Sequence, residues 1–102
     1  MSKQNLQALA KDKTKLTDVL QKLDTHREIA AFLEDVLTPE ELTEIAQRLE
    51  IAQLVLAGRT YDEITAKTGA SSTTVSRIAQ TIKYGNDSFK KIFGTGGEHH
   101  GS

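Results

Sequence analysis

Apolar and polar side chains alternate along most of the chain with the three- and four-residue spacing of amphipathic α-helices. One stripe with this spacing predicts a first helix over about residues 3–23: Leu16, Val19, Leu20 and Leu23. Within it, residues 3–12 either fray or form a short helix of their own. Thr25-His26-Arg27-Glu28 then has the pattern of a capping box, which opens a second helix. Strand signals are absent from the sequence, so we expect an all-α fold.

The longest apolar pattern belongs to a helix expected from Thr38 to about Ala57. Its start has a threonine suited to the N-cap, a proline at the first helical position and glutamates near the positive end of the helix dipole. Gly58 is expected to end it as a left-handed C-cap. Apolar residues also fall off the main stripe, at Ile51 and Leu54. A helix that is apolar on more than one face usually lies at the centre of a bundle or is covered by a second subunit.

Two short helices joined by a tight turn are expected over about residues 60–84. Thr60 to Glu63 form another capping box, and the helix that they open ends before Gly69. Gly69 can adopt the positive φ that reverses the chain in few residues. Ser71 can cap the next helix, which ends near Gly85.

The C-terminal part of the chain is expected to hold one more short helix, over residues 88–93, with Asn86 or Asp87 as its cap. The glycine-rich stretch 94–102 has few side chains to bury and is predicted to be a disordered tail. The length of 102 residues suits one domain. We therefore expect a single helical domain over residues 1–93.

A short capped helix, a turn containing glycine and a second helix with polar outer side chains are the layout of a DNA-reading helix-turn-helix. Apolar side chains can hold its two helices together and against the long helix: Ile64, Val75, Ile78 and Ile82. The first turn of the second helix is small and hydroxylated, so it can approach a major groove closely. Thr65 and Thr68 stand where this motif usually has a small apolar and an aliphatic residue, which should weaken the packing.

The polar side of this helix-turn-helix supplies the predicted DNA contacts. Arg77 can pair with a guanine or a phosphate, and Gln80 can pair with an adenine. Base and phosphate contacts are expected from the second helix: Ser71, Ser72, Thr73, Ser76, Arg77 and Gln80. Thr60 and Tyr61 are expected to touch backbone phosphate, with Lys83 as a lesser contact. Two ordinary core helices with a polar outer face would show the same spacing.

Charge is distributed unevenly, although the formal net charge is only −1. Residues 38–58 carry Arg48 against four glutamates, a balance of −3. Residues 71–93 carry four basic side chains against Asp87, a balance of +3. Basic charge therefore collects on the expected reading surface.

Composition argues against several other classes of protein. The absence of cysteine excludes disulfides and thiolate metal sites. His26, His99 and His100 have no carboxylate cluster at metal-ligand spacing, and no serine or threonine has an evident base beside it. We therefore expect neither a metal site nor an enzyme. No apolar run approaches the roughly 20 residues that span a membrane, so a cytoplasmic protein located at the nucleoid is expected.

Several motifs in order resemble the Trp repressor family, and most closely its YerC/YecD subfamily: Leu37-Thr38-Pro39, Gln47-Arg48-Leu49-Glu50, Gly69-Ala70-Ser71 and Tyr84-Gly85-Asn86-Asp87. The resemblance covers about residues 25–93. It implies double-stranded DNA as the partner and an intertwined homodimer with two reading heads about one DNA turn apart. Such a dimer would explain why the helix over residues 38–57 is apolar on more than one face.

The resemblance also implies an effector site, with one important departure. The family's corepressor-binding threonine and two arginines map onto Thr38, Arg48 and Arg77. The family's glycine after the second arginine maps onto Ile78, whose branched side chain should fill the space that the glycine leaves for tryptophan. We therefore expect no tryptophan corepressor and no other cofactor, and Arg48 becomes a structural or phosphate-facing residue. The sequence leaves open whether a different small-molecule effector is sensed.

The sequence thus predicts a DNA-binding transcriptional regulator, of the repressor kind, that acts as a homodimer and reads a specific site in the major groove. The alternative is a helical protein-interaction or nucleoid-associated module without specific operator recognition. A steep fall of affinity with salt would favour DNA binding, because phosphate contacts release counterions.

Overall fold

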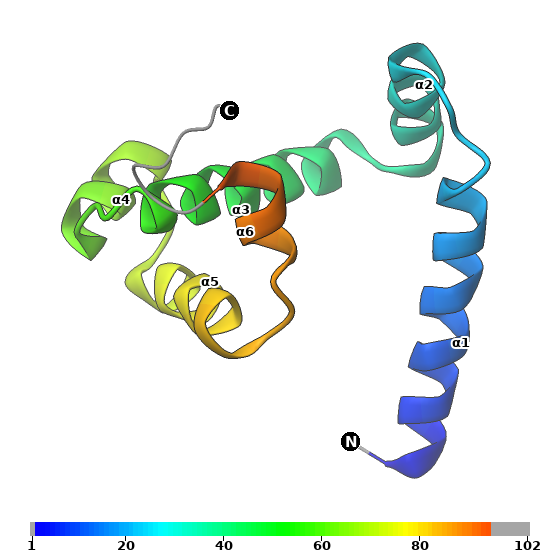
Figure 1. The fold of residues 1–102 in the computed structure, drawn as a ribbon, viewed down its shortest axis with the longest axis horizontal. Helices are drawn as coiled ribbons and strands as arrows, with labels where there is room; N and C mark the ends of the chain where they lie inside the picture. Colours follow the sequence, from blue (N-terminus) through cyan, green and yellow to red (C-terminus); the bar gives the residue numbers. More distant parts are fainter. Residues whose placement is uncertain (1, 95–102) are drawn as a thin grey trace. The chain divides into compact units, whose positions relative to one another are not determined.

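The structure is a computed structural model that describes residues 2–94. These residues form helices and no strand, which confirms the all-α expectation (Figure 1). The helices are α1 (Lys3–Leu20), α2 (His26–Val36), α3 (Pro39–Leu56), α4 (Tyr61–Thr68), α5 (Ser72–Tyr84) and α6 (Ser88–Phe93). The chain divides into two compact units, Met1–Pro39 and Glu40–Ser102. A single domain over residues 1–93 stays a prediction, and the predicted disordered tail from residue 95 onward lies outside the described residues.

The first unit contains α1 and α2. Residues 3–12 belong to one continuous α1 and are not a separate short helix. α1 ends at Leu20, earlier than predicted, because the next amides bond three residues back: Lys22 to Val19 and Leu23 to Leu20. The Thr25–Glu28 capping box at the start of α2 is present in both directions, as predicted.

The facing sides of α1 and α2 form a small apolar hollow of about 270 Å³. Its lining residues are Asp12, Lys15, Leu16, Val19, Phe32 and Val36. Neither helix contains a fully buried residue, and Leu16 and Val36 are each about half exposed. The first unit therefore leaves a large apolar surface uncovered.

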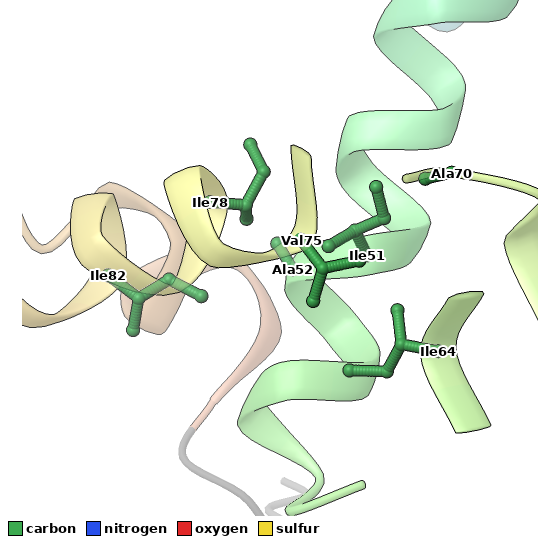
Figure 2. Packing of buried hydrophobic residues seen from close by; sticks show 7 residues of the cluster. All are labelled: Ile51, Ala52, Ile64, Ala70, Val75, Ile78 and Ile82. Carbon is green, nitrogen blue, oxygen red and sulfur yellow. The ribbon is translucent and has the colours of Figure 1, made fainter. Parts of the chain in front are cut away.

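The second unit is built around α3. Its core contains residues from α3, α4, the following turn and α5, which Figure 2 shows lying together: Ile51, Ala52, Ile64, Ala70, Val75, Ile78 and Ile82. Phe89 and Phe93 of α6 pack against this cluster. The second unit thus holds α4 and α5 in a fixed relation, since both bury apolar side chains against α3.

The two apolar faces of α3 have different surroundings. Ile51, which lies off the main stripe, is fully buried in the core. Leu42, Ile45 and Leu49 of the main stripe are each 39% exposed. The exposed stripe is available for a second subunit, as the sequence pattern suggested.

Glycines end the helices of the second unit largely as predicted. Gly58, after α3, has φ +83°, and Gly69, after α4, has φ +79°.

Asp87 stands at the cap position of α6, but the predicted side-chain capping bond is absent. Its backbone, at φ −90° and ψ 21°, is not in the extended conformation of an N-cap, and its carboxylate lies 4.0 Å from Lys90 instead. Within the described residues, no helix is both long and apolar enough to cross a membrane.

Candidate nucleic-acid interface

α4 is held at both ends by local hydrogen bonds. At its start, Thr60 Oγ1 accepts from the Glu63 amide at 3.1 Å, and Glu63 Oε1 accepts from the Thr60 amide at 2.9 Å. At its end, the Gly69 amide donates to the Thr65 carbonyl. The predicted capping box and the predicted left-handed glycine are both present, so the sequence located this helix correctly.

α5 begins at a cap formed by Ser71, whose hydroxyl accepts from the Thr74 amide at 3.2 Å. The first turn of α5 contains no acidic side chain. The amides of Ser72 and Thr73 are among those that a helix N-terminus leaves unpaired, and neither has a partner within residues 2–94. This end of α5 therefore offers amide donors and the positive end of a helix dipole to an anion.

An open hollow of about 640 Å³ lies where the start of α4 meets the first turns of α5. We call it the α4–α5 hollow, and its lining residues are Tyr61, Ser72, Thr73, Ser76, Arg77 and Gln80. All six were predicted to contact DNA. The core side chains Val75, Ile78 and Ile82 of α5 are buried instead, so α5 is divided into an apolar face and a polar one.

The polar side chains of the α4–α5 hollow have no partners in the part of the chain that the structure describes. Neighbouring hydroxyl groups are bonded: Thr81 donates to the Arg77 carbonyl, and Thr68 donates to the Ile64 carbonyl. The hollow therefore gathers hydroxyl, amide and guanidinium groups that are free to bind a ligand, beside hydroxyl groups that are already used in the fold.

Three residues of the predicted DNA-binding set do not line the hollow. Thr60 and Ser71 use their hydroxyl oxygens as helix caps. Lys83 lies in the last turn of α5, with Nζ 5.3 Å from the centroid of the Tyr84 ring. Their contacts with DNA remain predictions, and for Thr60 and Ser71 only part of the hydroxyl's bonding capacity is left.

The residues of the predicted effector site are divided between the two units. Thr38 belongs to the first unit, whereas Arg48 and Arg77 belong to the second. Arg48 is exposed, and no hydrogen bond or ion pair joins its side chain to another residue among 2–94. Ile78 is buried in the core, as its branched apolar side chain suggested.

The sequence reasoning missed a hydrogen bond that connects α3 to the end of α4. Gln47 Nε2 donates to the Thr68 carbonyl at 3.1 Å, across 21 residues of sequence. Thr68 Oγ1 also accepts from the Ala70 amide at 3.2 Å. The threonine that seemed unfavourable for packing therefore organises the turn before α5, and the sequence held no local signal for it.

Electrostatics at the start of α4 favour a charged Glu63. The hydrogen bond from the Thr60 amide lowers the pKa of Glu63 below its ordinary value of 4.5, and Arg59 at 3.9 Å adds to the effect. Asp62 lies in the same first turn. The start of α4 is therefore negatively charged, in contrast to the start of α5.

Within residues 2–94, histidine and carboxylate side chains form no group of three that could hold a metal ion.

A short capped helix, a turn with a left-handed glycine and a second helix with a polar outer face, both packed on α3, are the layout of the helix-turn-helix class. The chain belongs to the Trp repressor family, because residues 11–95 match the family described as Trp repressor protein. Members of this family are regulatory DNA-binding proteins, which confirms the expectation that the chain is not an enzyme.

Relatives agree with this assignment. The chain is 42% identical over 59 residues to the uncharacterised protein YerC of Bacillus subtilis strain 168, a stretch that covers 58% of this chain and 57% of YerC. The chain thus matches little more than half the length of that relative.

Two crystal structures have the same fold. One is a TrpR-like protein from Eubacterium eligens ATCC 27750, with TM-score 0.72 and 38% identity over 78% of this chain and 82% of that one. The other is a candidate Trp repressor from Staphylococcus aureus, with TM-score 0.71 and 33% identity over 90% of both chains. The predicted resemblance to Trp-repressor-like proteins is confirmed.

Proposed function

We propose that this protein is a sequence-specific transcriptional regulator, of the repressor kind, that binds double-stranded DNA at the nucleoid. The first turns of α5 enter the major groove, where Arg77 and Gln80 contact base edges. Ser72, Thr73 and Ser76 supply hydroxyl groups, and the free amides at the start of α5 hold a phosphate.

The observation that carries this proposal is the α4–α5 hollow. A polar surface that only faces water needs no particular composition, whereas this one joins a guanidinium, an amide and three hydroxyl groups that have no partner among residues 2–94. These are the side chains that pair with guanine, adenine and phosphate. The acid-free start of α5 adds an electrostatic reason for an anionic ligand.

Exposed apolar surfaces support the proposal that the regulator is a homodimer. Leu42, Ile45 and Leu49 form an uncovered stripe on α3, and the hollow between α1 and α2 is apolar as well. Contiguous apolar surfaces that are exposed in a single chain usually mark sites where another protein binds. In a dimer, two α5 helices would read half-sites separated by about 34 Å, one turn of DNA.

The test is selection from a random duplex library, followed by fluorescence anisotropy at two salt concentrations. We expect the wild-type protein to select a site with two related half-sites. Arg77→Ala should lose about 1–3 kcal/mol of binding free energy on that site. Arg27→Ala removes the same charge from an exposed position on α2, outside the hollow, and should bind the site as the wild type does.

Two other outcomes would contradict the proposal. If no site is enriched and binding is weak at both salt concentrations, the protein is a helical protein-interaction module. If binding is tight and strongly salt-dependent but no sequence is preferred, it is a nucleoid-associated protein without operator recognition.

A further inference from the structure

The α4–α5 hollow contains one side chain that differs in kind from the others. Tyr61 is the aromatic residue among its six lining residues, occupies the first position of α4 and is 45% exposed. The other five residues come from α5 and carry hydroxyl, amide or guanidinium groups. The lining of the hollow therefore includes one aromatic side chain.

The start of α4 is a poor place for the phosphate that Tyr61 was expected to contact. In the backbone the two helix starts are alike, because each has one amide bonded to its cap, Glu63 in α4 and Thr74 in α5; they differ in charge. Asp62 and Glu63 add negative charge to the first turn of α4, which repels an anion. The first turn of α5 contains no acidic side chain, so a phosphate is better held there. The ring of Tyr61 is then left for another part of the DNA.

The major groove presents hydrogen-bonding groups on every base pair, together with one apolar group, the 5-methyl group of thymine. The side chains of α5 suit the hydrogen-bonding groups. A tyrosine ring on the wall of the same hollow suits the methyl group, because contact between them removes apolar surface from water.

We propose that Tyr61 is a specificity-determining residue, whose ring lies against the methyl group of a thymine while α5 pairs with neighbouring base edges. This inference rests on the proposed function, because it needs α5 in the major groove. Burial of one methyl group gives about fourfold preference for the base that carries it.

The test uses the site selected by the wild-type protein, with each thymine replaced in turn by deoxyuridine. This change removes the methyl group and keeps every hydrogen-bonding group. At one thymine in each half-site, the wild type should lose about fourfold in affinity. Tyr61→Phe keeps the ring and should show the same loss. Tyr61→Ala should bind the thymine and deoxyuridine duplexes equally.

Two controls separate the role of the ring from general damage. Tyr61 lies outside the buried cluster, so Tyr61→Ala should keep the helical circular dichroism and melting temperature of the wild type. Tyr84→Ala removes another exposed tyrosine, outside the hollow, and should keep the discrimination between thymine and deoxyuridine.

The inference is overturned if the wild type binds both duplexes equally at every thymine, or if Tyr61→Ala still discriminates between them. Loss of discrimination in Tyr61→Phe would also overturn it, because the phenol hydroxyl would then be the contacting group. In all three cases a selected site still exists and the proposed function stands. Failure of the wild type to select any site is the distinct result that overturns both.

Discussion

Hydroxyl groups around the helix-turn-helix fall into two sets that the sequence does not distinguish. Ser71 caps α5, and Thr68 bonds within the turn. The hydroxyl groups of Ser72, Thr73 and Ser76 have no hydrogen-bond partner among residues 2–94, and these residues line the α4–α5 hollow. Two adjacent serines, Ser71 and Ser72, therefore have different roles, one in the fold and the other on the binding surface.

This difference makes a matched pair of predictions. Ser71→Ala removes a cap and should lower the free energy of unfolding by about 0.5–2 kcal/mol. Ser72→Ala removes an exposed, unbonded hydroxyl and should change that free energy by less than about 0.5 kcal/mol while weakening DNA binding. Urea denaturation and fluorescence anisotropy measure the two effects. The opposite pattern, with Ser72→Ala the less stable variant, would contradict the assignment.

Ile78 bears on the response to an effector. Its side chain is buried in the core, at the position where the resemblance places the family's corepressor-contacting glycine. Millimolar L-tryptophan should therefore leave the melting temperature unchanged, because protein atoms occupy the space that the glycine would leave. Thermal shift and titration calorimetry check this expectation. A rise in melting temperature that saturates with tryptophan concentration would show that a site exists.

Among the helices, α4 depends most clearly on a few local contacts. It is only eight residues long, and the reciprocal Thr60–Glu63 bonds hold its start. The Thr60 amide and Arg59 keep the pKa of Glu63 below its ordinary value. A carboxyl group with a lower pKa in the folded state stabilises the fold above its unfolded pKa, and this contribution is lost as the pH falls through the folded pKa.

We therefore expect Glu63→Gln to be less stable than the wild type near neutral pH. The difference in unfolding free energy should shrink as the pH falls below 4.5 toward the lowered pKa of Glu63. Urea denaturation over a pH series measures it. Glu34→Gln, an exposed change on α2, is the control and should show no such trend. A difference that stays constant into acid would mean that the charge of Glu63 contributes nothing.

At the scale of the whole molecule, residues 2–94 expose more apolar surface than the core of the second unit covers. The exposed stripe on α3 consists of Leu42, Ile45 and Leu49, and α1 exposes Leu6 and Leu9 as well. Leaving such surfaces in water is unfavourable, so a second subunit would stabilise the fold as well as double the reading surface.

Ile45→Glu tests whether the α3 stripe is an interface. Ile45 lies outside the buried cluster, so the second unit should still fold with glutamate there. We expect a dimer for the wild type and dissociation for Ile45→Glu in sedimentation velocity, because a charge in an apolar interface is costly. Gln53→Glu places the same charge on an exposed polar position of α3 and should remain dimeric. A wild type that is monomeric at every concentration would contradict the dimer.

Most helix boundaries were predictable from the sequence because their signals are local. The Thr25 and Thr60 capping boxes join residues three apart, and the positive φ of Gly58 and Gly69 follows from their lack of a side chain. The same reasoning failed at Asp87, where the residue type suits a cap but the backbone conformation does not. It also placed the end of α1 too late, because the apolar stripe continues to Leu23 after the helical hydrogen bonds have ended.

Residue order along the chain was therefore enough to establish helix type, approximate boundaries and the polar face of α5 that lines the α4–α5 hollow, since spacing places residues on one face of a helix. Packing determined the rest. It buried Ile51 and left Leu42 exposed, and it joined Gln47 to the Thr68 carbonyl across 21 residues. It also brought the ring of Tyr61 beside the polar face of α5. These features depend on contacts between different helices, which the spacing of residues within one helix cannot encode.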